Sequence, residues 1–545
     1  MGPSLVTKQA QHSRTLPITT AAPVKGLNTV DPLASMDAAY GLSIQNFIAT
    51  PQGLNVREGY RVWSTGLPGV VSSLMPYHAQ ITTNSKLFAA SVSGFYDVTS
   101  GGVVGAAVVS GLNASNPNWQ HAQQTSVSKN FLVCVNGLDT PRLYDGTTWT
   151  TTTQAASPVL GQFSINDNNA QAVNTTAFVD VMLHQRRMWF TTANSTKAYY
   201  TDIDQPTGQL YAFDFGPEFT RGGALHKLVS WSINMGSVSG VQSNLVAIST
   251  KGDVLIYVGN NPSVSTNFAL SGRYLLGAPC GRRCTIDFQS DVLYLSQDGL
   301  YPLSQYIQSS TLNNTDAITT KISNVIGDLI TSYGSTPGFD MCIYPGRNVL
   351  LLNIPQSSTA NNFQFCFNTV TDGWTQFTGW GAQCWGLFNN SLFFGGTGQV
   401  CLAFIGYSDG ADINGNGGNN IIATALTAFT FMEKPGVLKH VHQVKPFIVT
   451  GASNPTIRVG VNTDFSLIPI VGSATLNPIT GAVWDSATWD NGAATWVGSL
   501  TTYNQWSTPL CYPADALAFA VSISATSQTM WTGTGWIIEP AGQWG

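Results

Sequence analysis

A pattern that recurs along the middle of this chain constrains its fold more than any other feature. It consists of a short apolar run with strand character, a turn and a second such run. It occurs seven times, as KLFAASVSGFYDVTSGG (85–101), FLVCVNGLDTPRLYDGTTWT (131–150), RMWFTTANSTKAYYTDI (187–203), LVAISTKGDVLIYVG (245–259), VLYLSQDGLYPLS (292–304), VLLLNIPQSSTANNFQFCFNTVTDGWTQF (349–377) and SLFFGGTGQVCLAFIG (391–406). Seven units over residues 85–410 average about 47 residues each, within the roughly 40–50 residues that a four-stranded propeller blade takes. The repeat therefore predicts an all-β chain built around a β-propeller of about six or seven blades.

The turns between the paired runs favour the same fold. Lys251-Gly252 and Asp298-Gly299 are hairpin turns with β-forming residues on both sides. Only 9% of the residues are charged, so the polar surface must come mainly from Ser, Thr, Asn, Gln and Gly. Such a composition is typical of a β-rich protein with many turns and little helix.

The sequence pattern divides the chain into four parts. Residues 1–25 have no periodicity and are interpreted as an extended N-terminal arm. Residues 26–406 form the predicted propeller domain, in which 26–84 lead into the first repeat. A Gly/Asn-rich loop at 407–420 follows. Residues 421–545 alternate like strands of a two-faced sheet and predict an additional C-terminal antiparallel β-domain, which includes the widely spaced Trp484, Trp489 and Trp496.

Charge and apolar patterning exclude several classes of protein. The chain has 23 basic and 28 acidic residues, a net charge of −5, and no basic residue after Arg458. Tight nucleic-acid binding is not expected, because it requires a basic excess or stripe. No apolar run reaches the roughly 18 residues of a membrane-spanning helix, and no secretion signal opens the chain. The eight dispersed cysteines are accordingly expected to be reduced, buried thiols.

An arginine pair, Arg282 and Arg283 in CGRRC, is the first candidate site. A guanidinium pair can grip a carboxylate or phosphate, or it can pin neighbouring chain ends to the propeller rim or a subunit interface through backbone carbonyls. Without a Gly-rich cradle the structural role is favoured, and Arg221 in a second turn is a candidate to join the pair. The neighbouring Cys280 and Cys284 lack further zinc ligands and are expected to be small buried residues.

A second cluster lies in KHVHQVK, where Lys439, His440, His442 and Lys445 follow one another. His440 and His442 are two residues apart and so share one face of a strand. A metal site would need a third ligand that the sequence does not provide. A solvated or interface-facing patch is the favoured interpretation.

Two further motifs resemble known sites but depart from them. Asp412, Asn414 and Asn416 begin like an EF-hand loop, yet the twelfth position is Ala423 rather than the bidentate Glu, so a flexible turn is expected. YDGTTW (144–149) is similar to the Asp box of sialidase-like propellers but lacks one intervening residue. No catalytic, metal or cofactor residue is predicted, and the chain is not expected to be an enzyme.

Several segments resemble the tail nozzle proteins of short-tailed bacteriophages. The opening PVKGLNTVDPLASMDAAYGLSIQNFIATPQGLNVREGYRVWSTGLPGVVSSLMPY (23–77) is similar to the opening of these proteins. GPEFTRGGALHKLVSW, GDVLIYVGNNPS, GAPCGRRCTIDFQSDVLYLSQDGLYPLSQ and VWDSATWDNGAATW resemble later segments of the same family. The resemblance extends over roughly 23–545 through diffuse motifs; residues 1–22 and the loop near 410–420 have no counterpart in it.

This resemblance implies a structural virion protein of the phage tail, assembled in the host cytoplasm. The family forms a ring, typically of six copies, below the portal and the head-to-tail adaptor protein. The ring encloses and closes the distal channel for ejected DNA, which passes without specific binding, and it offers docking surface for the tail fibre protein. The alternatives are a host-surface glycan-binding or glycan-cleaving propeller protein and a monomeric propeller scaffold.

Overall fold

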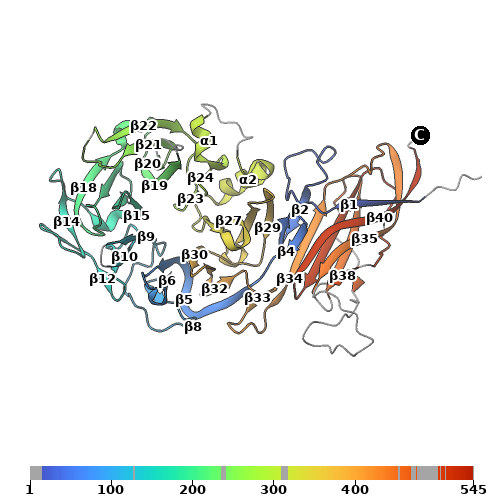
Figure 1. Cartoon of the computed structure of the whole chain (residues 1–545), viewed down its shortest axis with the longest axis horizontal. Helices are drawn as coiled ribbons and strands as arrows, with labels where there is room; N and C mark the ends of the chain where they lie inside the picture. The colour runs from blue at the N-terminus through green and yellow to red at the C-terminus, as the bar shows by residue number, and fades with distance from the viewer. Residues whose placement is uncertain are drawn as a thin grey trace, which may run out of the picture. The chain divides into compact units, whose positions relative to one another are not determined.

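The computed structural model describes residues 15–126, 129–234, 241–264, 266–308, 317–451, 455–467, 474–475, 501–503, 505–509 and 511–543. Trp484, Trp489 and Trp496 lie outside the described residues. The chain separates into two compact units that are both built mainly from strands (Figure 1). The propeller unit comprises Gly59–Cys366 and Phe377–Asn419, and the sandwich unit comprises Met1–Glu58, Phe367–Gln376 and Asn420–Gly545. The predicted all-β class, a propeller with an additional β-domain, is confirmed.

Seven successive sheets make up the propeller and follow one another around a ring (Figure 1). The first sheet contains the second half of β5 (Tyr60–Tyr77) with β6 (Lys86–Ser91) and β7 (Gly94–Asp97), and the second contains β9 (Gln120–Thr125), β10 (Asn130–Val135), β11 (Arg142–Tyr144) and β12 (Trp149–Thr151). The third contains β15 (Phe178–His184), β16 (Arg187–Thr192), β17 (Lys197–Tyr200) and β18 (Gly208–Asp214), and the fourth contains β19 (Leu225–Asn234), β20 (Val241–Ser249), β21 (Asp253–Gly259) and β22 (Phe268–Leu275). The fifth contains β23 (Thr285–Phe288), β24 (Asp291–Ser296) and β25 (Gly299–Pro302), the sixth β26 (Asp340–Tyr344), β27 (Val349–Ile354) and β28 (Phe363–Asn368), and the seventh β30 (Cys384–Phe388), β31 (Ser391–Gly395) and β32 (Thr397–Ala403). Each sequence repeat supplies the second and third strands of a sheet, whereas β18 and β22, the fourth strands of their sheets, follow the repeats. The first strand of every sheet lies outside the repeat.

The long strand β5 closes the ring. Its first half pairs antiparallel with β32, the last strand of the seventh sheet, as in the pair Ser64 and Val400. Its second half pairs antiparallel with β6 of the first sheet, as in the pair Leu74 and Ala89. One strand therefore completes the last sheet and begins the first, which leaves neither with an unpaired edge at the closure.

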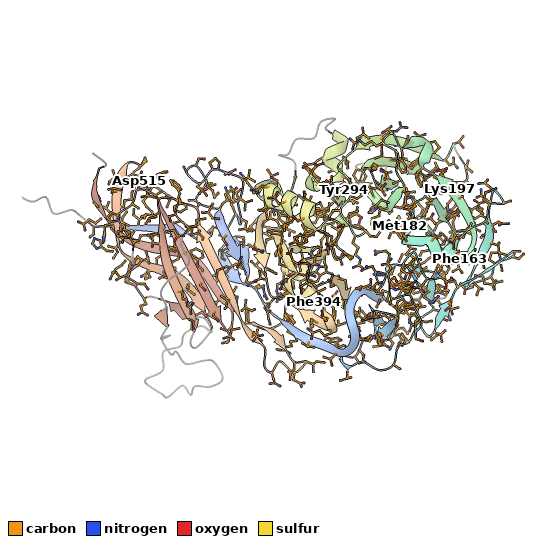
Figure 2. The ribbon with its side chains drawn as sticks, turned by 180° about the vertical axis from the view of Figure 1, so that it is seen from behind. Phe163, Met182, Lys197, Tyr294, Phe394 and Asp515 are labelled. Carbon is orange, nitrogen blue, oxygen red and sulfur yellow. The ribbon has the colours of Figure 1, made fainter. Side chains whose placement is uncertain are left out.

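Apolar clusters between neighbouring sheets hold the ring together. Phe131 of the second sheet packs in one cluster with Phe178 and Phe190 of the third. Trp189 of the third sheet packs in the next cluster with Leu228 of the fourth. Figure 2 shows side chains filling the space between the strands, with Phe163, Tyr294 and Phe394 labelled among them. Each fully buried side chain of this size stabilises the fold by about 1.5–3 kcal/mol.

The fifth sheet is followed by a helical segment. Its described strands are β23, β24 and β25, and the chain then forms the short helix α1 (Leu303–Gln308) and the helix α2 (Ser323–Tyr333). Ile326 and Ile330 of α2 are buried, as expected for two residues four positions apart on one helical face. Within the described residues, no helix has the length and apolar character needed to cross a membrane.

The sandwich unit consists of two sheets that meet in an aromatic core. In the first, β40 (Thr529–Gln543) pairs with β35 (Val437–Thr450) on one edge and with β1 (Leu16–Ala21) and β4 (Gly53–Val56) on the other, and β4 continues to β3 (Phe47–Thr50). In the second, β34 (Asn419–Thr427), β39 (Leu517–Ala525) and β36 (Thr456–Thr463) lie side by side, and β2 (Gly41–Gln45) pairs with β34. Phe519 of β39 contacts Trp531 and Trp536 of β40 at ring distances of 5.6 and 5.8 Å.

The predicted division of the chain differs from this structure in three places. Residues 16–21, expected in an extended arm without periodicity, form β1 and alternate in exposure along β40. Residues 26–58, expected in the propeller, belong to the sandwich unit, where β2, β3 and β4 find their partners. Residues 408–411, expected in a loop, form β33 (Ser408–Ala411), which pairs parallel with β5. In all three places the partner strand is distant in sequence, so the local pattern does not indicate it.

Candidate functional site in the propeller channel

The first strands of the sheets surround the propeller axis. Strands β5, β9, β15 and β19 contact one another in this order, the fifth sheet follows, and β26 and β30 lead back to β5. Several of these strands carry polar residues; β9 for example reads QHAQQT. Polar side chains on first strands face the channel, where they must find partners among themselves or bind something else.

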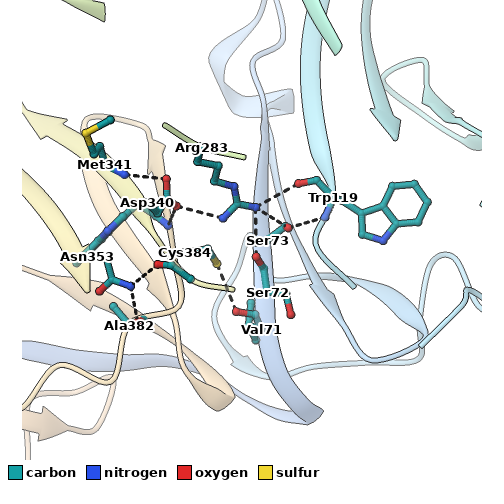
Figure 3. Close-up of polar contacts among 12 residues, drawn as sticks. Val71, Ser72, Ser73, Trp119, Arg283, Asp340, Met341, Asn353, Ala382 and Cys384 are labelled. Carbon is teal, nitrogen blue, oxygen red and sulfur yellow. Dashed lines mark hydrogen bonds and ion pairs between the residues drawn. The ribbon is translucent and has the colours of Figure 1, made fainter. Parts of the chain in front are cut away.

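Arg283 is the centre of a polar hub that joins five of the seven sheets (Figure 3). It precedes β23 of the fifth sheet, and its Nη1 lies 3.1 Å from Oδ2 of Asp340 in the sixth. Its Nη2 donates to the carbonyl of Ser72 at 3.2 Å, to Oγ of Ser73 at 2.8 Å and to the carbonyl of Trp119 at 3.2 Å. The planar guanidinium suits this position because its several donors diverge in a fixed geometry.

Asp340 completes the hub from the other side. Its Oδ2 accepts from Arg283 and, at 3.1 Å, from the backbone N–H of Trp385 in the seventh sheet. Its Oδ1 accepts from the backbone N–H of Met341 at 2.9 Å. Burial raises the pKa of Asp340, whereas the Arg283 charge and these N–H groups oppose the rise. The pair is mostly buried, with side chains 20% and 10% exposed, so removing one partner would leave a buried charge unpaired.

Arg282 makes a separate, reciprocal contact with the fourth sheet. Its Nη1 donates to the carbonyl of His226 in β19. In turn, Nε2 of the His226 ring lies 2.9 Å from the carbonyl oxygen of Gly281, the residue before Arg282. Because a carbonyl only accepts, Nε2 must carry the proton. Burial, with the nearby Arg282 charge, lowers the pKa of His226 to about 4, so this ring is neutral near pH 7.

Further polar groups on the first strands pair across neighbouring sheets. Lys227 of β19 lies 3.3 Å from Asp180 of β15. Nδ1 of His184, on β15, lies 2.8 Å from Oγ of Ser230 on β19. His184 is 2% exposed, and burial lowers its pKa to about 4. These contacts join the first strands by hydrogen bonds, while Nε2 of His184 is buried without a partner in the described part of the chain.

Two cavities adjoin the first strands. One, of about 260 Å³, is lined mainly by residues near the strand starts; the lining residues are Asn116, Asn118, Gln120, Asn136, Val179, Gly281, Arg282, Arg283 and 334–339. The other, of about 710 Å³, is lined by 121–126 along β9 and by Pro76, His78, Leu183, Arg186 and Asp204. We call the smaller one the channel-mouth cavity.

Arg221 does not share the partners of the arginine pair. Its Nη1 donates to the carbonyl of Leu276 at 2.8 Å, and its backbone N–H donates to the Asp253 carboxylate at 3.2 Å. Asp253 begins β21 and Leu276 follows β22, so Arg221 ties turns within the fourth sheet. It does not line the channel-mouth cavity.

The cluster predicted at 439–445 lies in the sandwich unit and is not a uniform solvated patch. Lys439 is buried: its Nζ donates to the carbonyls of Lys434, Val437 and Asp515 and to the Asp515 carboxylate, all at 2.8–2.9 Å. A lysine is tolerated inside the protein when its donors are satisfied in this way. The prediction of a solvated Lys439 is therefore wrong, because a distant segment supplies partners that the sequence does not reveal.

The remaining residues of that cluster are partly exposed. His440 and His442 share one strand face, with ring centroids 4.7 Å apart. His442 Nε2 lies 2.6 Å from Oε2 of Glu539 on β40, and Lys445 lies over the Trp506 ring at 4.9 Å. Within the described ranges, no three His, Cys, Asp or Glu side chains gather as a metal site would require.

The other motifs are local structural features. All eight cysteines are free, and all but Cys511 are buried, as expected; burial raises the pKa of Cys280 to about 12 and of Cys284 to about 11. In YDGTTW, Oδ1 of Asp145 accepts from the backbone N–H groups of Thr147 and Thr148 at 3.0 and 2.8 Å, which holds the turn. In DINGNG, Asp412 caps an exposed turn in the same manner.

Asp340, Ser73 and His184 belong to the channel network but were not predicted from the sequence. One signal was present: Asp340 is a lone acidic residue at the start of the otherwise apolar run DMCIY. A charged residue in such a run calls for a buried partner. That Arg283 is this partner follows only from the closed ring.

These strand pairings define the chain as a β-propeller protein with an additional β-sandwich unit. No protein-family model matches it, and no curated protein matches it. Among solved structures it is similar to YCF48 bound to D1 peptide (13% identity, 64% of this chain and 97% of that one, TM-score 0.34). It is also similar to the Cps50 (Swd1) β-propeller domain of Myceliophteria thermophila (11%, 62% and 100%, TM-score 0.36) and to Trypanosoma rangeli sialidase (9%, 92% and 94%, TM-score 0.27). At these identities the likeness concerns the fold alone.

Proposed function

We propose that this protein is a tail nozzle subunit of a short-tailed bacteriophage virion. The observation that carries the proposal is the resemblance of its segments, from 23–77 to the Trp-rich stretch near the C-terminus, to that family. In the proposed assembly six copies form a ring below the portal and the head-to-tail adaptor protein. The ring closes the distal DNA channel of the tail and offers docking surface for the tail fibre protein.

The propeller hub supports a structural role for this chain. In an enzyme, polar groups of the channel should converge on a reacting atom. Here Arg283, Asp340 and Ser73 satisfy one another, and the neighbouring histidines are buried and neutral. Such a network stiffens the ring of sheets, which suits a part that must hold its shape under the pressure of packaged DNA.

The charge of the chain also fits a conduit for DNA. A net charge of −5 gives no sequence-independent grip on phosphates, so DNA passing through a ring of such subunits would not be retained. The proposal therefore expects weak DNA binding by the free protein, even at low salt.

The decisive experiment is the mass and shape of the purified full-length protein, alone and with its adaptor. Mass photometry and electron microscopy should detect a closed ring of about six 58.1-kDa chains that docks on the adaptor. A chain that stays monomeric at micromolar concentration with the adaptor present, and that cleaves host polysaccharide, would contradict the proposal.

A glycan-binding propeller protein is the second candidate, favoured by the channel-mouth cavity. Three asparagines and one glutamine contribute to its lining, and amides are suited to sugar hydroxyls because they both donate and accept. None of the lining residues is Asp or Glu, so the cavity lacks the carboxylate pair that glycoside cleavage requires. Binding of a host polysaccharide by the isolated monomer would favour this candidate.

A further inference from the structure

The channel-mouth cavity has an unusual composition for an acidic protein. Two arginines line it and no carboxylate does, although acidic residues outnumber basic ones in the chain. Asp340 neutralises Arg283 from the side of the hub. Arg282 bonds a carbonyl, which leaves its positive charge uncompensated by any ion pair in the described part of the chain. Among the described residues, Arg282 is therefore the lining residue with a positive charge that no ion pair balances, although the nearby Asp139 carboxylate accepts from the side-chain amide of Asn136 at 2.8 Å.

Two lining side chains retain hydrogen-bonding capacity. Gln120, the first residue of β9, is 9% exposed, and its side-chain amide has no hydrogen-bond partner among the described residues. Arg282 uses Nη1 on His226, while its Nε and Nη2 have no partner there. These donors and acceptors are open to the cavity, so they are available to a ligand that enters it.

The rim beside these groups is held rigidly. The side-chain amide of Asn116 donates to the carbonyl of Asn136 at 2.7 Å, and that of Asn136 donates to the carbonyl of Asn116 at 3.1 Å. The backbone N–H and the side-chain amide of Asn118 both donate to Oδ1 of Asn116, each at 3.3 Å. A site ordered before binding loses little entropy when a ligand enters.

From this arrangement we propose that the channel-mouth cavity binds one carboxylated sugar unit of the hexuronate type. Arg282 binds the carboxylate through its free guanidinium edge, because planar guanidinium and carboxylate groups match in shape and charge. Gln120 and Thr336 serve the ring hydroxyls, which need partners that both donate and accept. A volume of about 260 Å³ lies just below the 300–1,000 Å³ typical of sites for drug-sized ligands and suits a single sugar ring. This inference does not depend on the proposed ring.

The test is a ligand-observed NMR titration of the full-length protein with sodium D-glucuronate, D-glucose and inorganic phosphate. We expect D-glucuronate to bind at least tenfold more tightly than either comparator, since D-glucose lacks the carboxylate and phosphate lacks the hydroxyls. Arg282→Gln should weaken D-glucuronate binding about tenfold or more, and Gln120→Met should weaken it several-fold. Arg221→Gln, at a propeller arginine outside the cavity, is the matched control and should change nothing.

Three outcomes would overturn the proposal. The first is D-glucuronate binding that Arg282→Gln and Gln120→Met leave unchanged. The second is phosphate binding as tight as that of D-glucuronate, which would make the cavity a simple anion site. The third is no detectable binding by the wild-type protein. Arg282→Gln could lower binding by destabilising the fold, which a lower melting temperature would reveal. In that case Gln120→Met, which retains the side-chain length, is the deciding variant: weaker D-glucuronate binding at an unchanged melting temperature supports the site, and unchanged binding contradicts it.

Discussion

The propeller unit and the sandwich unit are both antiparallel, yet they assemble from different distances along the chain. Most propeller pairs join consecutive strands; β20 and β21, for example, are separated only by residues 250–252. The sandwich places β1 and β4 on the edge of β40, and Thr20 bonds Trp536 across 516 positions. When consecutive strands pair, the strand–turn–strand pattern recurs in the sequence and can be recognised there. When strands from the two ends of the chain pair, no local pattern indicates the pairing.

The units also differ in how they treat buried polar groups. Arg283 and Asp340 bond side-chain and backbone groups that come from five sheets of the propeller. The sandwich core is largely apolar and aromatic, with Trp531 and Trp536 at 0% and 1% exposure, and its buried Lys439 is paired with Asp515. Loss of the charged partner at the Arg283 hub should therefore cost more stability than loss of one neutral hydrogen bond in the sandwich core. The expected effects are given from the largest to the smallest.

Arg283→Leu should have the largest effect. It leaves the Asp340 carboxylate buried without its cation, which typically costs about 3–5 kcal/mol of the free energy of unfolding. Hydrogen-exchange mass spectrometry should show faster exchange in the first strands of the propeller and little change in the sandwich. The double variant Arg283→Leu/Asp340→Asn should recover part of the loss. Equal instability of the single and double variants would contradict a charge-based role for the hub.

Acidification should weaken the propeller through His184. Burial lowers its pKa from 6.5 to about 4 in the folded protein, so the unfolded chain takes up the proton first as the pH falls. Stability is thus fully present above about pH 6.5 and declines toward pH 4, by about 3 kcal/mol for a difference of this size. Chemical denaturation across this range should show a shallower decline for His184→Gln than for the wild type. Identical pH profiles would show that His184 is not the group responsible.

Thr20→Val tests the long-range contact of the sandwich. Trp536 is 1% exposed, and its Nε1 donates to Oγ1 of Thr20 at 2.9 Å. Removing the hydroxyl leaves a buried indole N–H without a partner, at a cost of about 1–3 kcal/mol. The neighbouring Thr19 is exposed on the other face of β1, so Thr19→Val is the matched control and should be nearly neutral. Loss of protection in β1 and β40 should occur in Thr20→Val alone; an equal loss in both variants would refute the contact.

The sequence predicted the propeller through particular local features. The turns at Gly252 and Gly299 and the apolar runs beside them identify the later strands of each sheet, because turn chemistry and alternation are properties of neighbouring residues. The first strands were not predicted because they lie outside the repeat, and they range from the polar β9 to the apolar β30. The arginine pair is visible in the sequence because its two members are adjacent, whereas Asp340 lies 57 positions from Arg283.

Local sequence thus determined the strand class, the hairpins and the approximate number of blades, because these depend on residues within a few positions of one another. Tertiary structure decided which edges pair, so β5 closes the ring and β1 joins β40 across nearly the whole chain. It also decided that Arg283 holds a buried hub and that Lys439 is enclosed by carbonyls. Alternation along a strand specifies which face is buried but not what covers it, and only the folded chain brings such distant partners together.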